Sequence, residues 1–572
     1  MVTIPITDFE RRVKTTTMSK KPQRKALKPN VPTPPTRPLW IERVPWQILA
    51  LTLLVLVAYA NSLDGALVYD DQLAVKDPLV DSPGFGWSVF NLGQTRPLSF
   101  LTFHWSYLAA GSNPASWHWV SMLLHAATAV LLLLIARHHF SSGTAFIAAA
   151  LYAVHPLQSE AVAYLYQRST VLATLFALLS FLLFLGDRYA LSVVAFALSL
   201  LCKEETIALP VFLLSYDVVF RHRRPRVSYY LAMLGVQGLV AGRAFYMMPR
   251  VSAHPTVGYS VKGLSAFSFA LTEPRVIWSY LRLFVLPVGQ NVDHDVALSH
   301  GLFSPPSTLP ALLCLPALIG LLVWLAWRGN QVAFWALGFF ILLAPTSSIV
   351  PVQDVMFEHR VYFPLMGLVI AAAGLLGRLP KRLFAPAVGT ILIVLLILTI
   401  VRNRVWHDEK SLWTDAAEKS PNKPRPLASA GATWLTVDPE RALRYFDHAV
   451  TLNPQDPNVH DGLGAALLGT GHAVDALRQF DVAIAEGGEK PVYLTNRGMA
   501  FEALGRLDQA IDDYRRALQM DPCKEKARAH LIRDLAAQGN KPEALAATQV
   551  PAGCQLLPEQ VRALEELRDL LR

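Results

Sequence analysis

Apolar runs alternate with short polar connections along residues 44–401. Eight runs are strong candidates for membrane helices: Trp46–Ala60, Trp117–Ala136, Thr170–Gly186, Tyr229–Phe245, Pro310–Trp327, Val332–Pro345, Tyr362–Leu376 and Phe384–Val401. Three shorter runs alternate with them: Thr144–Val154, Leu191–Cys202 and Ile207–Phe220. Together they predict about eleven spans. Another run, Val261–Pro287, is interrupted by Glu273-Pro274-Arg275 and predicts a re-entrant segment, a hairpin or one more span.

Residues 402–572 carry an internal repeat in place of apolar runs. One small residue recurs every 34 positions, at Ala442, Ala476, Ala510 and Ala544. A 34-residue helix–turn–helix period with small residues at the helix crossing is typical of tetratricopeptide repeats. About four repeats fit, with a capping helix at Pro558–Arg572. Because such repeats stack into a solenoid with a concave face, we expect it to bind a protein or peptide; a purely stabilising cap is the alternative.

Composition agrees with a polytopic, all-α membrane protein. Apolar residues make up 53% of the 572 residues and charged residues 17%, against roughly 25% in soluble domains. This excludes a single soluble enzyme domain, a fibrous protein and a disulfide scaffold. The net charge of +9 lies largely in the tail and in short loops, which is the positive-inside pattern. We therefore expect no nucleic-acid binding.

The basic loops also predict the orientation. Residues 1–43 form a basic, Pro-rich tail, which we expect to be disordered and cytoplasmic together with the basic loops. The loops 61–116, 155–169, 203–206, 246–309 and 346–361 then face outward, and an odd number of spans places residues 402–572 outside too. The sequence has no Asn-x-Ser/Thr sequon, which favours a bacterial inner membrane and periplasm over the endoplasmic reticulum.

The four cysteines include no C-x-x-C pair, so no zinc or redox motif is indicated. Cys523 and Cys554 form a disulfide if the repeats lie in an oxidising compartment; two separate thiols are the alternative.

The first outward loop contains two adjacent acids, Asp70 and Asp71, shortly after the first span. A carboxylate at a membrane surface can take the proton of a hydroxyl acceptor as that oxygen attacks a sugar carbon. An ordinary acidic turn is the alternative. Arg96 follows in the same loop, where it is suited to holding a phosphate. The alternative is an arginine at the membrane interface whose guanidinium group reaches into water.

Polar residues also gather in the other outward loops. His155, Glu160 and Arg168 lie within fourteen residues at the end of one span, without metal-ligand spacing. Lys203 and Glu204 lie between short apolar runs, where ionisable residues are costly and often functional; a structural ion pair is the alternative. His359 and Arg360 begin a later span, so that Arg360 and Lys203 would supply two cations for a phosphate; a solvated helix start is the alternative.

Several blocks together resemble a known family: the Asp-Asp loop, RPLSFLTF, AVHPLQSEAVAYLYQRS, CKEETIALPVFLLSYD, EHRVYFPLMGL, RNRVWHDEKSLW and the repeats. They resemble the transmembrane and tetratricopeptide-repeat-containing O-mannosyltransferases and their bacterial relatives, of the GT-C superfamily, over about residues 45–545. The resemblance implies a polyprenyl-phosphate sugar donor, inversion at the anomeric carbon, and Asp70 or Asp71 as the base. It also implies a donor pocket lined by Arg96, His155, Glu160, Arg168, Lys203, Glu204, His359 and Arg360.

The sequence therefore predicts three regions: the tail 1–43, a GT-C-like catalytic domain at 44–401 and an extracytoplasmic repeat domain at 402–572. We expect transfer of mannose or another hexose to Ser/Thr hydroxyls of proteins recruited by the repeats. Two alternatives stay open: a glycan or lipid acceptor, and a non-catalytic membrane scaffold. No metal or other cofactor is expected. P-loop, G-x-S-x-G and dinucleotide motifs are absent from the sequence.

Overall fold

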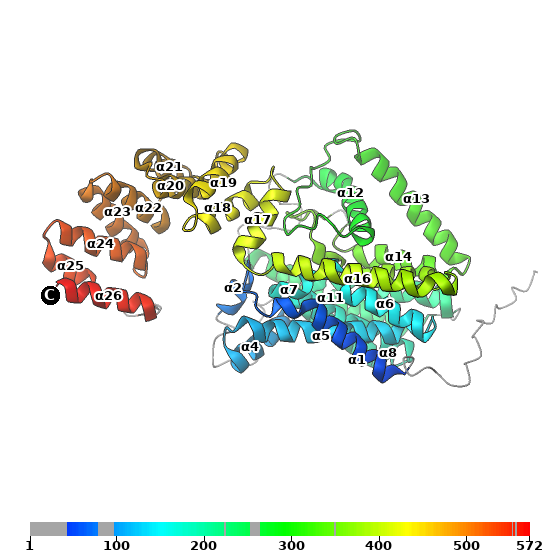
Figure 1. Ribbon diagram of the computed structural model, residues 1–572. Helices are drawn as coiled ribbons and strands as arrows, with labels where there is room; N and C mark the ends of the chain where they lie inside the picture. Colours follow the sequence, from blue (N-terminus) through cyan, green and yellow to red (C-terminus); the bar gives the residue numbers. More distant parts are fainter. Residues whose placement is uncertain are drawn as a thin grey trace, which may run out of the picture. The chain divides into compact units, whose positions relative to one another are not determined.

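The computed structural model describes residues 43–77, 80, 96–221, 225–251, 264–347, 350–551, 553–554 and 558–571. Throughout these residues the regular structure is helical (Figure 1). The predicted tail therefore lies almost wholly outside the described residues. The prediction of an all-α chain is confirmed.

Each of the eleven apolar runs forms a helix or part of one. The eight strong candidates correspond to α1 (Val44–Tyr59), α5 (Pro114–Ala136), α8 (Arg168–Leu185), α11 (Val227–Val251), α13 (Thr308–Trp327), α14 (Gln331–Leu343), α15 (Leu365–Leu376) and α16 (Lys381–Val405). The shorter runs correspond to α6 (Ser142–Val154), α9 (Tyr189–Cys202) and α10 (Leu209–Tyr216). Within the described residues, five helices are long and apolar enough to cross a bilayer, and four more are apolar but shorter, so the number of spans is not fixed.

Two elements differ from the sequence pattern. The run interrupted by Glu273-Pro274-Arg275 forms one continuous helix, α12 (Ala266–Val285), instead of a hairpin. Pro274 is accommodated inside it, nine residues after the Ser265 N-cap. A helix without a predicted counterpart, α4 (Pro97–Ala110), follows Arg96, and its proline stands in the first turn, where no backbone N–H is needed.

The C-terminal region continues from α16 as successive helix pairs (Figure 1). They are α17 (Glu409–Lys419) and α18 (Pro424–Trp434), α19 (Pro439–Leu452) and α20 (Pro457–Gly469), α21 (Ala473–Gly487) and α22 (Pro491–Ala503), α23 (Leu507–Met520) and α24 (Glu525–Ala537), and α25 (Lys541–Ala547) and α26 (Pro558–Leu571). The four alanines of the 34-residue period are fully buried in α19, α21, α23 and α25. The predicted repeat is confirmed.

Glycine is required where an aromatic ring of the next helix approaches the backbone. A Cβ on Gly498 would lie 2.5 Å from Tyr514, and one on Gly464 would lie 2.6 Å from Phe480. Tyr514 and Phe480 are 34 residues apart, as the two glycines are. The 34-residue period of these glycines therefore reflects a contact between an aromatic ring and the backbone that is repeated along the solenoid.

Gly498→Val is expected to destabilise the solenoid by about 1–3 kcal/mol, because the added side chain overlaps the buried Tyr514 ring. Ala485→Val, on an exposed position of α21, is the matched control and should cost less than about 1 kcal/mol. Thermal unfolding of the full-length protein followed by circular dichroism measures both. Equal unfolding midpoints for the two variants would contradict this packing.

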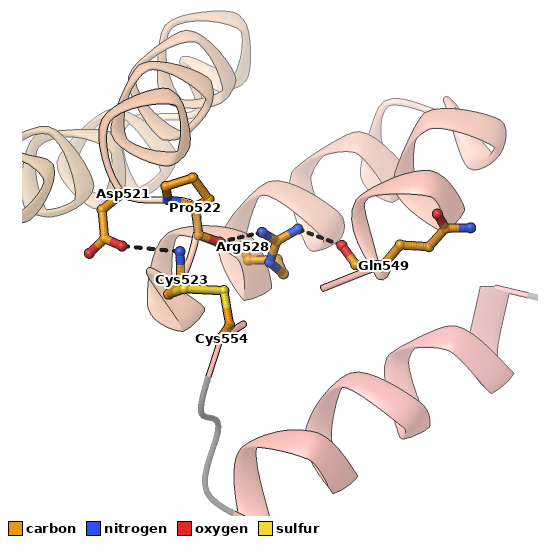
Figure 2. Close-up of a disulfide and its surroundings, with 6 residues drawn as sticks. All are labelled: Asp521, Pro522, Cys523, Arg528, Gln549 and Cys554. Atoms are coloured by element: carbon orange, nitrogen blue, oxygen red, sulfur yellow. Dashed lines mark hydrogen bonds between the residues drawn. A yellow bond between two sulfur atoms is a disulfide. The ribbon is translucent and has the colours of Figure 1, made fainter. Parts of the chain in front are cut away.

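A disulfide joins Cys523, between α23 and α24, to Cys554, between α25 and α26, so the bonded alternative is the correct one. Figure 2 shows Arg528 beside this bond, donating to the carbonyl oxygens of Pro522 and Gln549. Both sets of contacts connect the start of α24 to the segment after α25. They hold the segment between α25 and α26 against the α23–α24 pair.

Loss of this bond is expected to loosen the last repeat. Closing a loop of 31 residues constrains the unfolded chain by about 3–4 kcal/mol in the chain-entropy model. Cys523→Ser and Cys554→Ser should each lower the unfolding midpoint of the solenoid, and a reductant should do the same to the native chain. The exposed Cys314→Ser is the control and should leave the midpoint unchanged.

Candidate functional site

Loops that are far apart in the sequence meet at one end of the helix bundle. The first loop contacts the loop after α6 through Asp71 and the N–H of Tyr166. Arg96 contacts Glu204 after α9, and Glu160 contacts His359 before α15. The start of the solenoid joins the same end, because Val68, Tyr164, Trp413 and Leu427 share one apolar cluster. The loops predicted to face outward are therefore together.

Asp70 and Asp71 have different environments. Asp71 is 1% exposed, and its oxygens accept from the N–H groups of Tyr166 (2.7 Å) and Val68 (3.2 Å). Burial raises the pKa of Asp71 to about 8, although these N–H donors act in the opposite direction. Asp70 is half-buried and accepts one hydrogen bond from the Tyr164 hydroxyl at 2.8 Å. Asp71 thus fixes the loop, and Asp70 presents an accessible carboxylate.

The backbone just before these acids is strained. Tyr69 adopts a left-handed conformation with φ of 53°, which is costly for a residue with a Cβ. Its N–H donates to Glu409 of α17 at 2.6 Å, and its ring contacts Tyr164 and Trp413. Contacts from the first solenoid helix therefore help to hold the loop that carries Asp70.

Two ion pairs lie in the loop after α9. Arg96 pairs with Glu204 at 3.0 Å and is partly exposed. Lys203 is 4% exposed, pairs with Glu205 at 2.6 Å, and also donates to Gln167 Oε1 and Thr170 Oγ1. Arg96 is therefore the more accessible of these two cations.

Glu160 and His359 form the buried centre of the site. Glu160 accepts from the backbone N–H groups of Glu358 and His359, and its Oε1 is 2.6 Å from His359 Nδ1. Burial and then the positive charges of Lys203, Arg360 and Arg96 hold the pKa of His359 well below its ordinary value. The lowered pKa favours the neutral imidazole. Its Nε2 lies 3.9 Å from Glu205, which connects it to Lys203.

The remaining predicted residues are engaged with backbone groups. His155 Nδ1 accepts from the N–H of Leu157, and its Nε2 donates to the carbonyl of Phe284. Arg168 is fully buried and donates to the carbonyls of Thr102 and Trp117 and to the Ser106 hydroxyl. Arg360 donates to the carbonyls of Val355 and Asp354. These three side chains connect the backbones of the loops and helices around the site, and they do not join the Lys203 ion pair.

Some residues of the site lacked a sequence signal. Glu205 pairs with Lys203, and Tyr164 donates to Asp70, although neither residue belongs to a motif with its own chemistry. A clamp at the start of the solenoid was also missed: Arg425 pairs with both Asp293 and Asp354, and Lys423 pairs with Asp293. Although burial opposes it, Arg425 and Lys423 lower the pKa of Asp293. These partners are more than 70 residues apart, so local spacing could not indicate them.

Comparisons with known proteins show what this chain is similar to. A dolichyl-phosphate-mannose-protein mannosyltransferase family model matches residues 96–242, and a tetratricopeptide repeat model matches 491–522. Mouse protein O-mannosyl-transferase TMTC3 is 25% identical, over 87% of this chain and 62% of its own length. Human TMTC1 is 36% identical, over 22% of this chain and 16% of its own. The chain thus spans 62% of the mouse TMTC3 relative.

Among solved structures, ArnT from Cupriavidus metallidurans bound to undecaprenyl phosphate aligns with 82% of this chain and 80% of its own, at 16% identity and a TM-score of 0.36. That likeness is too low to carry an argument. The family matches define the class: a helical membrane protein that joins a mannosyltransferase-like region to a tetratricopeptide solenoid. Within this class, the chain is similar to the transmembrane and tetratricopeptide-repeat-containing O-mannosyltransferases, as its sequence blocks indicate.

Proposed function

We propose that this chain is a membrane glycosyltransferase that moves mannose or another hexose from a polyprenyl-phosphate donor to Ser/Thr hydroxyls of proteins. The observation that carries the proposal is the accessible Asp70 carboxylate, held by Tyr164 at the end of the bundle where the basic and acidic loop residues meet. The similarity to O-mannosyltransferases supports the choice of reaction.

In this proposal Asp70 is the general base. Its carboxylate takes the proton of the acceptor hydroxyl while that oxygen attacks the anomeric carbon of the sugar. The bond between this carbon and the phosphate oxygen breaks, the configuration inverts, and the polyprenyl phosphate leaves with the electron pair. Asp71 acts through the backbone of the loop, because its own oxygens accept from N–H groups.

The donor phosphate is assigned to Arg96, with Lys203 behind it. A guanidinium offers two parallel N–H donors to phosphate oxygens, and Arg96 is partly exposed. Glu204, its present partner, is 60% exposed and can turn to water when a phosphate binds. Lys203 adds positive charge that stabilises the leaving group, and Glu160 orients neutral His359 beside it.

The solenoid is assigned to acceptor recruitment, on the outer side of a bacterial inner membrane. The Cys523–Cys554 bond supports this side, because disulfides persist in oxidising compartments. The clamp of Arg425 with Asp293 and Asp354 supports a fixed delivery of the acceptor, since it joins the first repeat to the loop before His359.

Mass-spectrometric glycoproteomics of extracytoplasmic proteins, with and without this gene, tests the proposal. We expect hexose-sized losses on Ser/Thr peptides in the deletion strain, with rescue by the native chain but not by Asp70→Asn. An unchanged glycoproteome would overturn the protein acceptor, and a changed envelope polysaccharide or lipid would then identify the acceptor class. An unchanged envelope as well would favour a non-catalytic scaffold.

A further inference from the structure

A cavity of about 340 Å³ lies at the start of the solenoid, and its lining includes none of the residues assigned to transfer. Its walls come from α17, α18 and α19 and the turn between the first two. The lining residues are Ala417, Glu418, Pro421, Leu427, Arg441, Arg444, Tyr445 and His448. One wall is apolar, and the other is a basic and aromatic face of a single helix.

That basic face is partly preorganised. The Arg441 guanidinium lies over the Trp434 ring at 4.0 Å, and its Nη2 is 3.4 Å from the Tyr445 hydroxyl. Stacking of this kind holds a guanidinium in place while its N–H groups stay available. Arg444 is exposed one turn further on, and within the described part of the chain it has no ion-pair partner. Two guanidinium groups therefore converge on one cavity.

In the part of the chain that the structure describes, one carboxylate pairs with these cations. Glu418 Oε1 is 3.9 Å from Arg441 Nη2, and the Glu418 side chain is 67% exposed. An exposed pair at this distance contributes little and is readily exchanged. A stronger anion can therefore displace Glu418 at small cost.

The repeat pattern does not require these residues. One period later, the positions of Arg441, Tyr445 and His448 are Asp475, Gln479 and Val482, whereas the position of Arg444 is again an arginine, Arg478. Two periods later they are Gln509, Asp513 and Arg516. The packing alanines and aromatic residues recur at this period, and Arg444 recurs once, but the cluster of all four residues does not. Solenoid packing therefore does not explain it.

We propose that this cavity binds a phosphate group, with Arg441 and Arg444 donating to its oxygens. Paired guanidinium groups match the geometry of phosphate oxygens, and Tyr445 and His448 offer further polar contacts. The apolar wall of Leu427, Pro421 and Ala417 suits the small organic group that the phosphate carries. The phosphate belongs either to a lipid headgroup or to a small soluble phosphate.

Titration calorimetry of the full-length protein in maltoside micelles at 150 mM chloride tests the site, with inorganic phosphate and glycerol 1-phosphate as probes. We expect saturable binding that Arg441→Gln and Arg444→Gln each weaken about tenfold or more. Arg478→Gln, on an exposed arginine at the position of Arg444 in the next repeat, should leave it unchanged. Arg444→Gln decides the result if Arg441→Gln unfolds, because Arg444 is exposed.

The source of the phosphate is separated by changing the lipid. Phosphatidylglycerol nanodiscs should abolish binding of the soluble probes if the cavity takes a lipid headgroup, and should leave it intact if it takes a soluble phosphate. Absence of binding, or equal binding by the native chain and Arg444→Gln, would overturn the proposal. Asp70→Asn should bind the probes normally, so this test is independent of the transferase assignment.

Discussion

Replacement of Asp70 by Asn is expected to lower kcat/KM for sugar transfer by about 10²–10⁴-fold, which is the range of general-base catalysis. The amide keeps the shape of the carboxylate but cannot take the acceptor proton. The fold should be unaffected, because the half-buried Asp70 side chain accepts from the Tyr164 hydroxyl, and an amide oxygen can accept the same hydrogen bond. Initial rates with a synthetic polyprenyl-phosphate mannose and a Ser/Thr peptide measure the loss, and the unfolding midpoint measures the fold.

Asp71→Asn and Tyr164→Phe are the matched comparisons. Asn at 71 points an amide N–H group at a backbone N–H group, which we expect to destabilise the loop by about 1–3 kcal/mol. Its activity should therefore fall together with its stability. Tyr164→Phe should lower kcat about tenfold, with little change in KM, because it frees the Asp70 carboxylate to rotate. Full activity in Asp70→Asn would remove Asp70 from the mechanism.

The pair of acids illustrates what the sequence can predict. Apolar runs indicated where the helices lie, since a bilayer demands length and low charge, and the 34-residue period indicated the solenoid. The Asp-Asp motif indicated the loop that carries the candidate base. It could not separate Asp70 from Asp71, because the difference depends on N–H groups of Val68 and Tyr166, and Tyr166 is 95 residues away.

The basic residues show the corresponding limit. Charge and position made Arg96, Arg168, Lys203 and Arg360 equivalent candidates for a phosphate. The fold gives Arg168 and Arg360 to backbone carbonyls and pairs Lys203 and Arg96 with acids. Which cation stays accessible is decided by helix packing, and a linear pattern does not contain that information. The continuous helix α12 is a second case, because helix packing accommodates Pro274 although a proline disfavours a helix interior.

Lys203→Met is expected to destabilise the membrane domain by about 3–5 kcal/mol, because it leaves the partly buried Glu205 carboxylate without its cation. It also removes the donor to Gln167 and Thr170. The loss should appear as a lower midpoint in fluorescence-detected size-exclusion chromatography after heating. Arg478→Met, which breaks an exposed pair with Asp475, is the control and should change stability by less than about 1 kcal/mol.

The double variant Lys203→Met with Glu205→Gln separates stability from chemistry. It contains no uncompensated charge, so we expect it to recover most of the lost stability. Its transfer rate should stay low, because the positive charge assigned to the donor phosphate is still missing and Glu205 no longer faces His359 Nε2. A double variant that is both stable and fully active would assign the pair to structure alone. Of the two cations Arg96 and Lys203, Arg96 would then be the one that binds the donor phosphate.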